Sequence, residues 1–264
     1  MDKPKIKLPV GTGVYETIAI VNRRPAFLAL HLERLERGAG WLAIPRARER
    51  VEQMILNKLG ACPEEPMAMR AEAPGHGIPG TSVWPRKRDL TGGPIGLLWP
   101  KAGKARGAED TIKHTQRAAK TTARNDAKAA GCWDALITND KGIAVEGTVT
   151  NVFAVLDDKL VTPGDDLFPL PGITRAIVLE EARKVGIPIE LRGLTAEDLA
   201  RARELFLTNS LVGVLPVDFV VLADAKRVDL PDSHAIAQRL AAAHQAREDE
   251  DLKSAPAPVE MGEA

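Results

Sequence analysis

The N-terminal part of the chain has the apolar pattern of two strands followed by two helices. The runs Val14 to Val21 and Ala26 to Leu30 are rich in aliphatic residues, and a polar turn separates them. Such runs, bounded by turn residues, predict a pair of strands. Apolar residues three and four positions apart then predict helices over 31–42 and 46–59. From 62 to 85 Pro and Gly are frequent, and no periodicity persists.

The rest of the chain alternates between strand-like and helix-like patterns. Residues 94–99 predict a strand, and the polar segment 100–110 predicts a connector. The longest helical pattern covers 111–130 and ends before Gly131. The following segments predict strands over 134–138, 143–155 and 159–162, a helix between Pro171 and Gly186, a strand over 187–191, a short helix that Thr195 caps, strands over 204–208 and 212–222, and a closing helix over 233–247.

This mixture predicts an α+β protein in two lobes. We expect a small N-terminal α/β domain over 1–100, a connector over 101–110, and a larger C-terminal domain with a mixed β core over 111–247. The tail 248–264 is acidic and rich in Ala and Pro, a composition that predicts disorder. No internal repeat is present.

Composition narrows the classes of function. Basic and acidic residues number 36 each, so no overall electric field favours nucleic acid or an anionic membrane. Aromatic residues, at 4%, are too few for a base-stacking surface. Cys62 and Cys132 have no metal-type spacing, and we expect reduced thiols and no metal site. Without a secretory signal or a run of roughly 20 apolar residues, a cytoplasmic protein without a membrane span is expected.

Four elements of the sequence together suggest a chemistry. Lys113 and Glu146 are 33 residues apart, and two turns rich in small residues follow, Leu170 to Arg175 and Leu207 to Ser210. A reactive amine, an acid for a ring nitrogen and turns that can hold a phosphate are what covalent binding of pyridoxal 5′-phosphate requires. At Gly172 a predicted helix begins, and its free N–H groups favour an anion.

Each element also has a structural interpretation. Lys113 taken alone is a solvated charge, and Glu146 is the outward-facing residue of a strand. The turn at Gly172 is an ordinary helix start, and Tyr15 is a half-buried strand aromatic. Only the ordered set distinguishes a cofactor site from these alternatives.

That set belongs to a longer series of motifs in a fixed order. The series is Gly13-Val14-Tyr15-Glu16-Thr17, His31-Leu32-Glu33-Arg34-Leu35, Lys113, Val145-Glu146-Gly147 through Asn151-Val152-Phe153, Thr162-Pro163, Leu170 to Arg175, Leu207 to Leu211 and Pro216-Val217. From about residue 11 to 220 the chain therefore resembles the class IV, or fold-type IV, pyridoxal-phosphate enzymes. The family includes branched-chain and D-amino-acid aminotransferases and aminodeoxychorismate lyases. The resemblance implies a two-lobed fold like that of the D-amino-acid aminotransferases, pyridoxal 5′-phosphate as the cofactor, a small-molecule amino substrate and a homodimer.

The resemblance also implies roles for individual residues. Lys113, expected to open a helix, is the catalytic lysine that bonds to the cofactor as an aldimine and later takes a proton from the substrate carbon. Glu146 faces the pyridine nitrogen and keeps it protonated. The residues expected to hold the cofactor phosphate are Arg34, Ile173, Thr174 and Ser210. The residues expected to bind substrate are Tyr15, Arg117 and Asn209.

Within the family, local sequence favours the lyase branch. Lys113-His114-Thr115-Gln116-Arg117 is similar to the lysine–x–x–Asn–Arg run of aminodeoxychorismate lyases, and Leu207-Thr208-Asn209-Ser210-Leu211 is closer to the lyase pattern. The predicted reaction converts 4-amino-4-deoxychorismate to 4-aminobenzoate, a folate precursor, and pyruvate. The alternative is an aminotransferase that uses branched-chain or D-amino acids with 2-oxoglutarate. A non-catalytic protein that keeps the fold is a further alternative.

Two departures from the family pattern concern the substrate. Only about ten residues precede the Gly-Val-Tyr-Glu motif, where the family has a longer strand. Residues 70–80 lack the family's Thr-Arg-Gly signature and contain Pro, Gly and His76 instead. Because this segment normally forms part of the pocket wall, the sequence leaves the substrate open.

Overall fold

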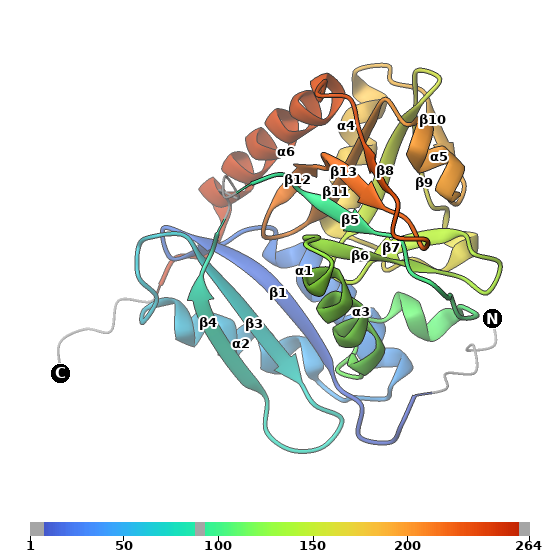
Figure 1. Ribbon diagram of the computed structural model, residues 1–264. Helices are drawn as coiled ribbons and strands as arrows, with labels where there is room; N and C mark the ends of the chain where they lie inside the picture. The colour runs from blue at the N-terminus through green and yellow to red at the C-terminus, as the bar shows by residue number, and fades with distance from the viewer. Residues whose placement is uncertain (1–7, 88–92, 259–264) are drawn as a thin grey trace, which may run out of the picture. The chain divides into compact units, whose positions relative to one another are not determined.

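The computed structural model describes residues 8–87 and 93–258 and divides them into two compact units. The first unit contains residues 8–87, 112–116 and 246–258. The second contains residues 93–111 and 117–245. Helices and strands occur in both, as an α+β fold requires (Figure 1).

The elements have the following bounds. The strands are β1 Val14–Val21, β2 Arg24–Pro25, β3 Met67–Ala73, β4 Gly80–Pro85, β5 Gly96–Leu98, β6 Asp134–Thr138, β7 Ala144–Gly147, β8 Asn151–Leu156, β9 Lys159–Thr162, β10 Ile189–Leu191, β11 Glu204–Asn209, β12 Gly213–Pro216, β13 Phe219–Val221 and β14 Arg227–Asp229. The α-helices are α1 Leu28–Trp41, α2 Ala47–Leu59, α3 Ala118–Ala129, α4 Ile173–Lys184, α5 Ala196–Arg201 and α6 Ala235–Ser254. Two 3₁₀ turns cover Ala108–Thr111 and Asp165–Leu167.

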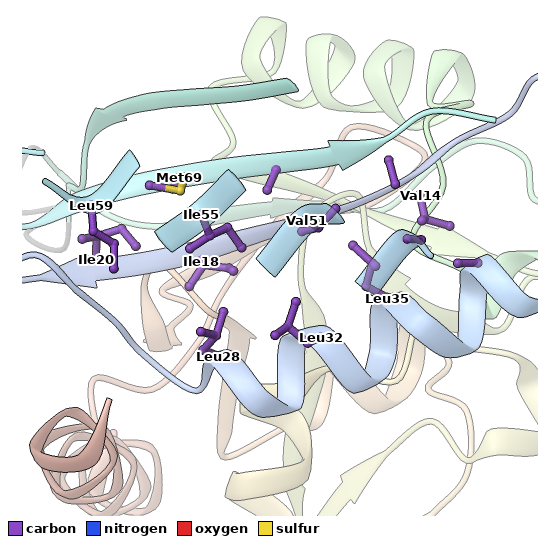
Figure 2. Packing of buried hydrophobic residues seen from close by; sticks show 14 of the residues in the cluster. Val14, Ile18, Ile20, Leu28, Leu32, Leu35, Val51, Ile55, Leu59 and Met69 are labelled. Atoms are coloured by element: carbon purple, nitrogen blue, oxygen red, sulfur yellow. The ribbon is translucent and has the colours of Figure 1, made fainter. Parts of the chain in front are cut away.

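The first unit is built on an antiparallel sheet with strand order β2-β1-β3-β4. Alternate residues of a strand point to opposite faces, so one set of β1 side chains packs against α1 and α2. Figure 2 shows this core between the sheet and the two helices. Its labelled members are Val14, Ile18, Ile20, Leu28, Leu32, Leu35, Val51, Ile55, Leu59 and Met69.

The residues around Lys113 extend the edge of β1 rather than opening a helix. The backbone N–H of Tyr15 donates to the carbonyl of Lys113 at 3.0 Å, and the N–H of Thr115 donates to Gly13 at 2.9 Å. Ile112 is buried in the same core as β1. The prediction of one helix over 111–130 is therefore wrong, because backbone pairing and the burial of Ile112 hold 112–116 against β1 and α3 begins only at Ala118.

The second unit contains two five-stranded sheets, ordered β10-β9-β8-β11-β12 and β14-β13-β5-β6-β7. Every residue of β8 is buried, which explains its continuous apolar run. Phe153 of β8 stacks on Phe206 of β11 with ring centroids 4.9 Å apart. Residues from α4 and α6 complete this layer of the core.

Three further expectations are corrected. The apolar run Ala26–Leu30 is not a strand, since α1 begins at Leu28 and buries that residue in its own core. The predicted strand over 143–155 is two strands, β7 and β8, separated by a bend of three threonine-rich residues. Residues 62–85, which showed no periodicity, contain β3 and β4.

The expected domain boundaries also differ from the compact units. Residues 112–116, placed by sequence in the C-terminal domain, belong to the first unit with 246–258. The tail is not disordered where the structure describes it, because α6 continues to Ser254. Glu248 is buried against Arg86, with carboxylate-to-guanidinium distances of 3.1 and 3.2 Å, and Asp251 accepts from the Phe27 backbone N–H at 2.6 Å. The composition of the tail indicates solvated charges and does not reveal these partners. Residues 259–264 lie outside the described part.

In the described ranges, no helix is long and apolar enough to cross a membrane. Nor do the described residues contain a group of three or more His, Cys, Asp or Glu side chains arranged to hold a metal. Cys62 and Cys132 are both buried free thiols.

Candidate active site

In the first unit, the side chain of Lys113 lies beside the ring of Tyr15. The Lys113 Nζ is 4.9 Å from the ring centroid, and the Arg70 guanidinium carbon is 3.9 Å from the same centroid. Tyr15 is buried, and both cations are attracted by the negative face of its ring. Arg70 is also ion-paired with Glu72. The predicted catalytic lysine and pocket tyrosine are thus neighbours.

Arg34, expected to hold a phosphate, forms a two-pronged ion pair with Glu16. Its Nε donates to Glu16 Oε1 at 2.8 Å and its Nη2 donates to Oε2 at 2.5 Å. His31 Nδ1 lies 2.7 Å from the same Oε2. All three side chains are buried, since α1 carries His31 and Arg34 on the face that covers the sheet. Glu16 therefore fixes the orientation of the guanidinium.

Burial and charge act in opposite directions on this cluster. Burial raises the pKa of Glu16, but the charges and hydrogen bonds of Arg34 and His31 outweigh it and leave the pKa far below its ordinary value. Burial lowers the pKa of His31, and the charges of Arg34 and Lys113 lower it further against the opposing effect of Glu16. A neutral His31 that donates its Nδ1 proton to an ionised Glu16 agrees with the lowered pKa of each residue. Its Nε2 is buried without a hydrogen-bond partner among the described residues.

In the second unit, Glu146 lies on β7 and is buried at the centre of a charged cluster. Its Oε1 accepts from Arg106 Nη2 at 2.5 Å and from Lys120 Nζ at 2.9 Å, and its Oε2 accepts from the Leu170 backbone N–H at 3.1 Å. Burial alone would raise the pKa of Glu146, but Lys120 and Arg106 lower it below its ordinary value. Glu146 is therefore an ionised carboxylate, which is the form that a ring N–H requires.

The start of α4 has the features of an anion site. Its N-cap, Gly172, provides no side-chain cap, so the first amides of the helix keep their donors for another partner. The Thr174 hydroxyl is buried without a hydrogen-bond partner among the described residues. Ile173 and Thr174 form the first turn. A phosphate would satisfy this unpaired hydroxyl and these amides, so the residues fit the group.

Close packing just before α4 explains why residue 172 is a glycine. A Cβ on Gly172 would lie 2.0 Å from Asn151 Oδ1, and Asn151 Nδ2 donates to the carbonyl of Leu170 at 2.9 Å. Asn151 of β8 thereby holds the turn at Leu170 and packs closely against Gly172. The same turn supplies the N–H that Glu146 accepts, so the carboxylate and the helix start are joined by one short segment.

The remaining predicted residues lie at element ends in the second unit. Asn209 ends β11, and its Oδ1 accepts from the backbone N–H groups of Leu211 and Val212 at 2.8 and 2.9 Å, so it shapes the turn that contains Ser210. Arg117 precedes α3 and donates to the Thr148 carbonyl at 3.2 Å. Burial lowers the pKa of Arg117, while the charge of Glu146 opposes that shift.

Comparison with known proteins decides the family. The model of the family described as amino-transferase class IV matches residues 13–220. The chain belongs to the class IV aminotransferase family. A probable branched-chain-amino-acid aminotransferase of Thermotoga maritima is 32% identical over an alignment of 231 residues that covers 78% of this chain and 76% of that protein. Enzymes of this family use pyridoxal phosphate.

Solved structures of class IV proteins have the same fold. The 4-amino-4-deoxychorismate lyase of Pseudomonas aeruginosa aligns with a TM-score of 0.75 and 27% identity over 94% of this chain and 97% of its own. A hypothetical aminotransferase from Mycobacterium tuberculosis in its PLP-bound form aligns with a TM-score of 0.74 and 22% identity over 90% and 89%. The family and the fold-type IV architecture are thus established, while aminotransferases and a lyase both occur among the similar proteins.

Sequence reasoning did not single out several charged residues that lie beside the predicted site residues. They are Glu16, His31, Arg70, Arg106 and Lys120. Glu16 and His31 lie inside the family motifs. The sequence could have indicated their burial, because each is a polar residue at a position where its strand or helix otherwise faces the apolar core. Lys120 has no such signal in the sequence, because its contact depends on how α3 and β7 meet.

Proposed function

We propose that the chain is a pyridoxal-phosphate-dependent aminotransferase that transfers the amino group of branched-chain amino acids to 2-oxoglutarate. The observation that carries this proposal is the Thermotoga maritima relative, which matches across most of both chains. Local motifs had favoured the lyase branch, and this long match supports the aminotransferase alternative better.

The residues proposed to hold the cofactor are those to which the family resemblance assigns this role. Lys113 would bond to its aldehyde, and Glu146 would accept from its ring nitrogen. The proposed phosphate ligands are Arg34, Ile173, Thr174 and Ser210. The buried, unpaired Thr174 hydroxyl and the ionised Glu146 support this assignment. When bound, the cofactor supplies a ring that accepts an electron pair from the substrate carbon.

The chain's own groups then perform the proton transfers. Lys113 in its neutral form would take the proton from the substrate carbon and return it at the other end of the transfer. Arg106 and Lys120 stabilise the ionised form of Glu146, and this carboxylate would face the ring nitrogen of a bound cofactor. Glu16 holds the Arg34 guanidinium in one orientation, so this side chain loses little freedom when it binds an anion.

The substrate carboxylate is proposed to bind near Tyr15. The Arg70 guanidinium lies over the Tyr15 ring that Lys113 also contacts, and Arg70 offers paired N–H donors to a carboxylate. Arg117 is assigned to the substrate as a second cation, and Asn209 as the residue that shapes the Ser210 turn. Both amino acids and 2-oxoglutarate carry the carboxylate that such a site requires.

A second candidate is aminodeoxychorismate lyase. It is favoured by the 27% identity to the Pseudomonas aeruginosa lyase across nearly the whole of both chains and by the Lys113-His114-Thr115-Gln116-Arg117 run. Lyase and aminotransferase would share Lys113 and Glu146, so the substrate distinguishes them.

One set of assays separates the candidates. The purified protein, loaded with pyridoxal phosphate, is incubated with leucine, isoleucine, valine or D-alanine plus 2-oxoglutarate, and glutamate is measured. A parallel sample receives 4-amino-4-deoxychorismate without an amino acceptor, and pyruvate and 4-aminobenzoate are measured. Glutamate from branched-chain substrates supports the proposal, whereas pyruvate and 4-aminobenzoate from the parallel sample support the lyase. The variant Lys113→Ala is the inactive control.

Two related proposals have separate tests. A colourless protein that shows no imine absorbance with added cofactor would support a non-catalytic relative. A homodimer, proposed from family membership, is tested by light scattering during size-exclusion chromatography. A cytoplasmic location stays a prediction, which fractionation of the source cells would test.

A further inference from the structure

Lys120 of α3 occupies an oxygen of the carboxylate that is proposed to face the cofactor. Its Nζ is 2.9 Å from Glu146 Oε1, and Arg106 Nη2 lies 2.5 Å from the same atom. The other oxygen accepts from the Leu170 backbone N–H at 3.1 Å. Both oxygens of Glu146 therefore have donors within the second unit. A ring N–H that binds Glu146 must share or replace one of these donors.

The two cations are anchored very differently. The Arg106 side chain is 3% exposed, pairs with Asp110 at 3.3 Å and donates to the carbonyl of Phe168 at 2.9 Å, in addition to its contact with Glu146. The Lys120 side chain is 25% exposed, and Glu146 is its one ion-pair partner in the part of the chain that the structure describes. A lysine ammonium on a flexible stem can turn into water, whereas a guanidinium held by three partners cannot move without breaking them. Lys120 is thus the exchangeable donor.

We propose that Lys120 is a placeholder cation for the cofactor's ring nitrogen. In the cofactor-free protein its ammonium pairs with Glu146, a buried carboxylate that would be costly to leave with less compensation. When the protonated ring nitrogen approaches, two positive donors compete for the same carboxylate and repel each other, so Lys120 gives up its contact. This inference rests on the proposed role of Glu146. Lys120 holds the Glu146 carboxylate in the cofactor-free protein and, by doing so, weakens cofactor binding.

The test measures cofactor affinity rather than activity. Cofactor-free samples of the full chain and of Lys120→Met are titrated with pyridoxal phosphate, followed by imine absorbance and tryptophan fluorescence. Removing one partly exposed charge pair that must break on binding should tighten the dissociation constant about three- to ten-fold. The melting temperature of cofactor-free Lys120→Met should fall, because Glu146 keeps one cation fewer, while the loaded variant should melt close to the loaded wild type.

Three controls make the interpretation specific. Lys128→Met removes an exposed lysine from the same helix and should leave the dissociation constant unchanged. An analogue of the cofactor in which carbon replaces the ring nitrogen should bind Lys120→Met no better than wild type, because it places no cation on Glu146. Lys120→Arg, which keeps the charge, should not gain affinity.

The outcomes separate this inference from the proposed function. Equal or weaker binding of pyridoxal phosphate to Lys120→Met overturns the placeholder role while the function stands. A gain that persists with the ring-nitrogen-free analogue overturns it as well, since the competition would not concern that nitrogen. If wild-type protein forms no imine with the cofactor, the proposed function itself fails.

Discussion

His31 is fully buried beside a carboxylate that Arg34 also contacts. Burial, together with the charges of Arg34 and Lys113, lowers the pKa of His31 below the ordinary 6.5. The folded state therefore binds this proton more weakly than the unfolded state does. Linkage then requires that His31 favour folding above the unfolded pKa and that this contribution disappear as pH falls.

From this sign we predict that acid destabilises the protein beginning near pH 6.5. Glu16, whose pKa is also lowered, adds a second loss of stability that starts near its ordinary value of 4.5 and deepens below it. The variant His31→Gln should show a flatter slope of unfolding free energy between pH 6.5 and 5, measured by urea denaturation. His76, whose side chain is not buried, provides the control His76→Gln, which should keep the wild-type slope. An unchanged slope in His31→Gln would contradict the assignment.

At the scale of elements, the turn before α4 has room for no side chain at Gly172. A Cβ there would approach Asn151 Oδ1 to 2.0 Å, so either Asn151 must move and lose its bond to Leu170 or the turn must shift. Gly172→Ala should therefore destabilise the protein by about 1–3 kcal/mol. It should also weaken binding of pyridoxal phosphate, because the amides of Ile173 and Thr174 move with the turn.

The matched control is Gly40→Ala. Gly40 lies within α1, and an added Cβ there meets nothing within 4 Å. This change should stabilise the protein by about 0.5–1 kcal/mol through helix propensity alone and leave cofactor affinity unchanged. Chemical denaturation and cofactor titration of the two variants measure both effects. Equal behaviour of the two variants would show that the turn tolerates a methyl group.

The last turns of α6 belong to the first unit through buried charge. Glu248 and Arg86 have side chains that are both 1% exposed, and they form a paired contact. Removing one member of this buried pair takes an opposite charge away from the other, so Glu248→Ala should cost about 3–5 kcal/mol of unfolding free energy. The exposed Glu250, which pairs with exposed Lys253 on the same helix, supplies the control Glu250→Ala, with an expected cost of about 0–1 kcal/mol. Urea denaturation of the two variants decides between a docked and a dispensable segment.

Across the whole molecule, sequence patterns predicted those elements that a short stretch of residues is enough to specify. Helix α5, with its Thr195 capping box, and the strands over 14–21, 134–138 and 159–162 needed only local pattern, and the structure confirms them. The backbone pairing of Lys113 with β1 and the ordered end of α6 depend on partners far away in the chain, which no local window contains. The family motifs predict roles for Lys113, Glu146 and Thr174, but they do not predict the cations around Glu146, because those contacts arise from packing.

A further prediction concerns the stability of the whole chain with cofactor bound. A cofactor that binds only the native state stabilises it by about 2.7 kcal/mol at a free concentration one hundred times its dissociation constant. Saturating pyridoxal phosphate should therefore raise the melting temperature, as measured by differential scanning fluorimetry. Lys113→Ala removes the amine that is proposed to bond to the cofactor, and Thr174→Val removes one proposed phosphate donor, so each should reduce the rise.

Comparing the two variants separates the roles of these residues. Lys113→Ala should abolish the imine absorbance yet keep a part of the melting-temperature rise, because the phosphate ligands remain. Thr174→Val should keep the imine absorbance and require more cofactor for the same rise, since it removes the buried hydroxyl that has no partner among the described residues. If Thr174→Val bound the cofactor as tightly as wild type does, the start of α4 would not be the phosphate site, and the assignment of Ile173 would fail with it.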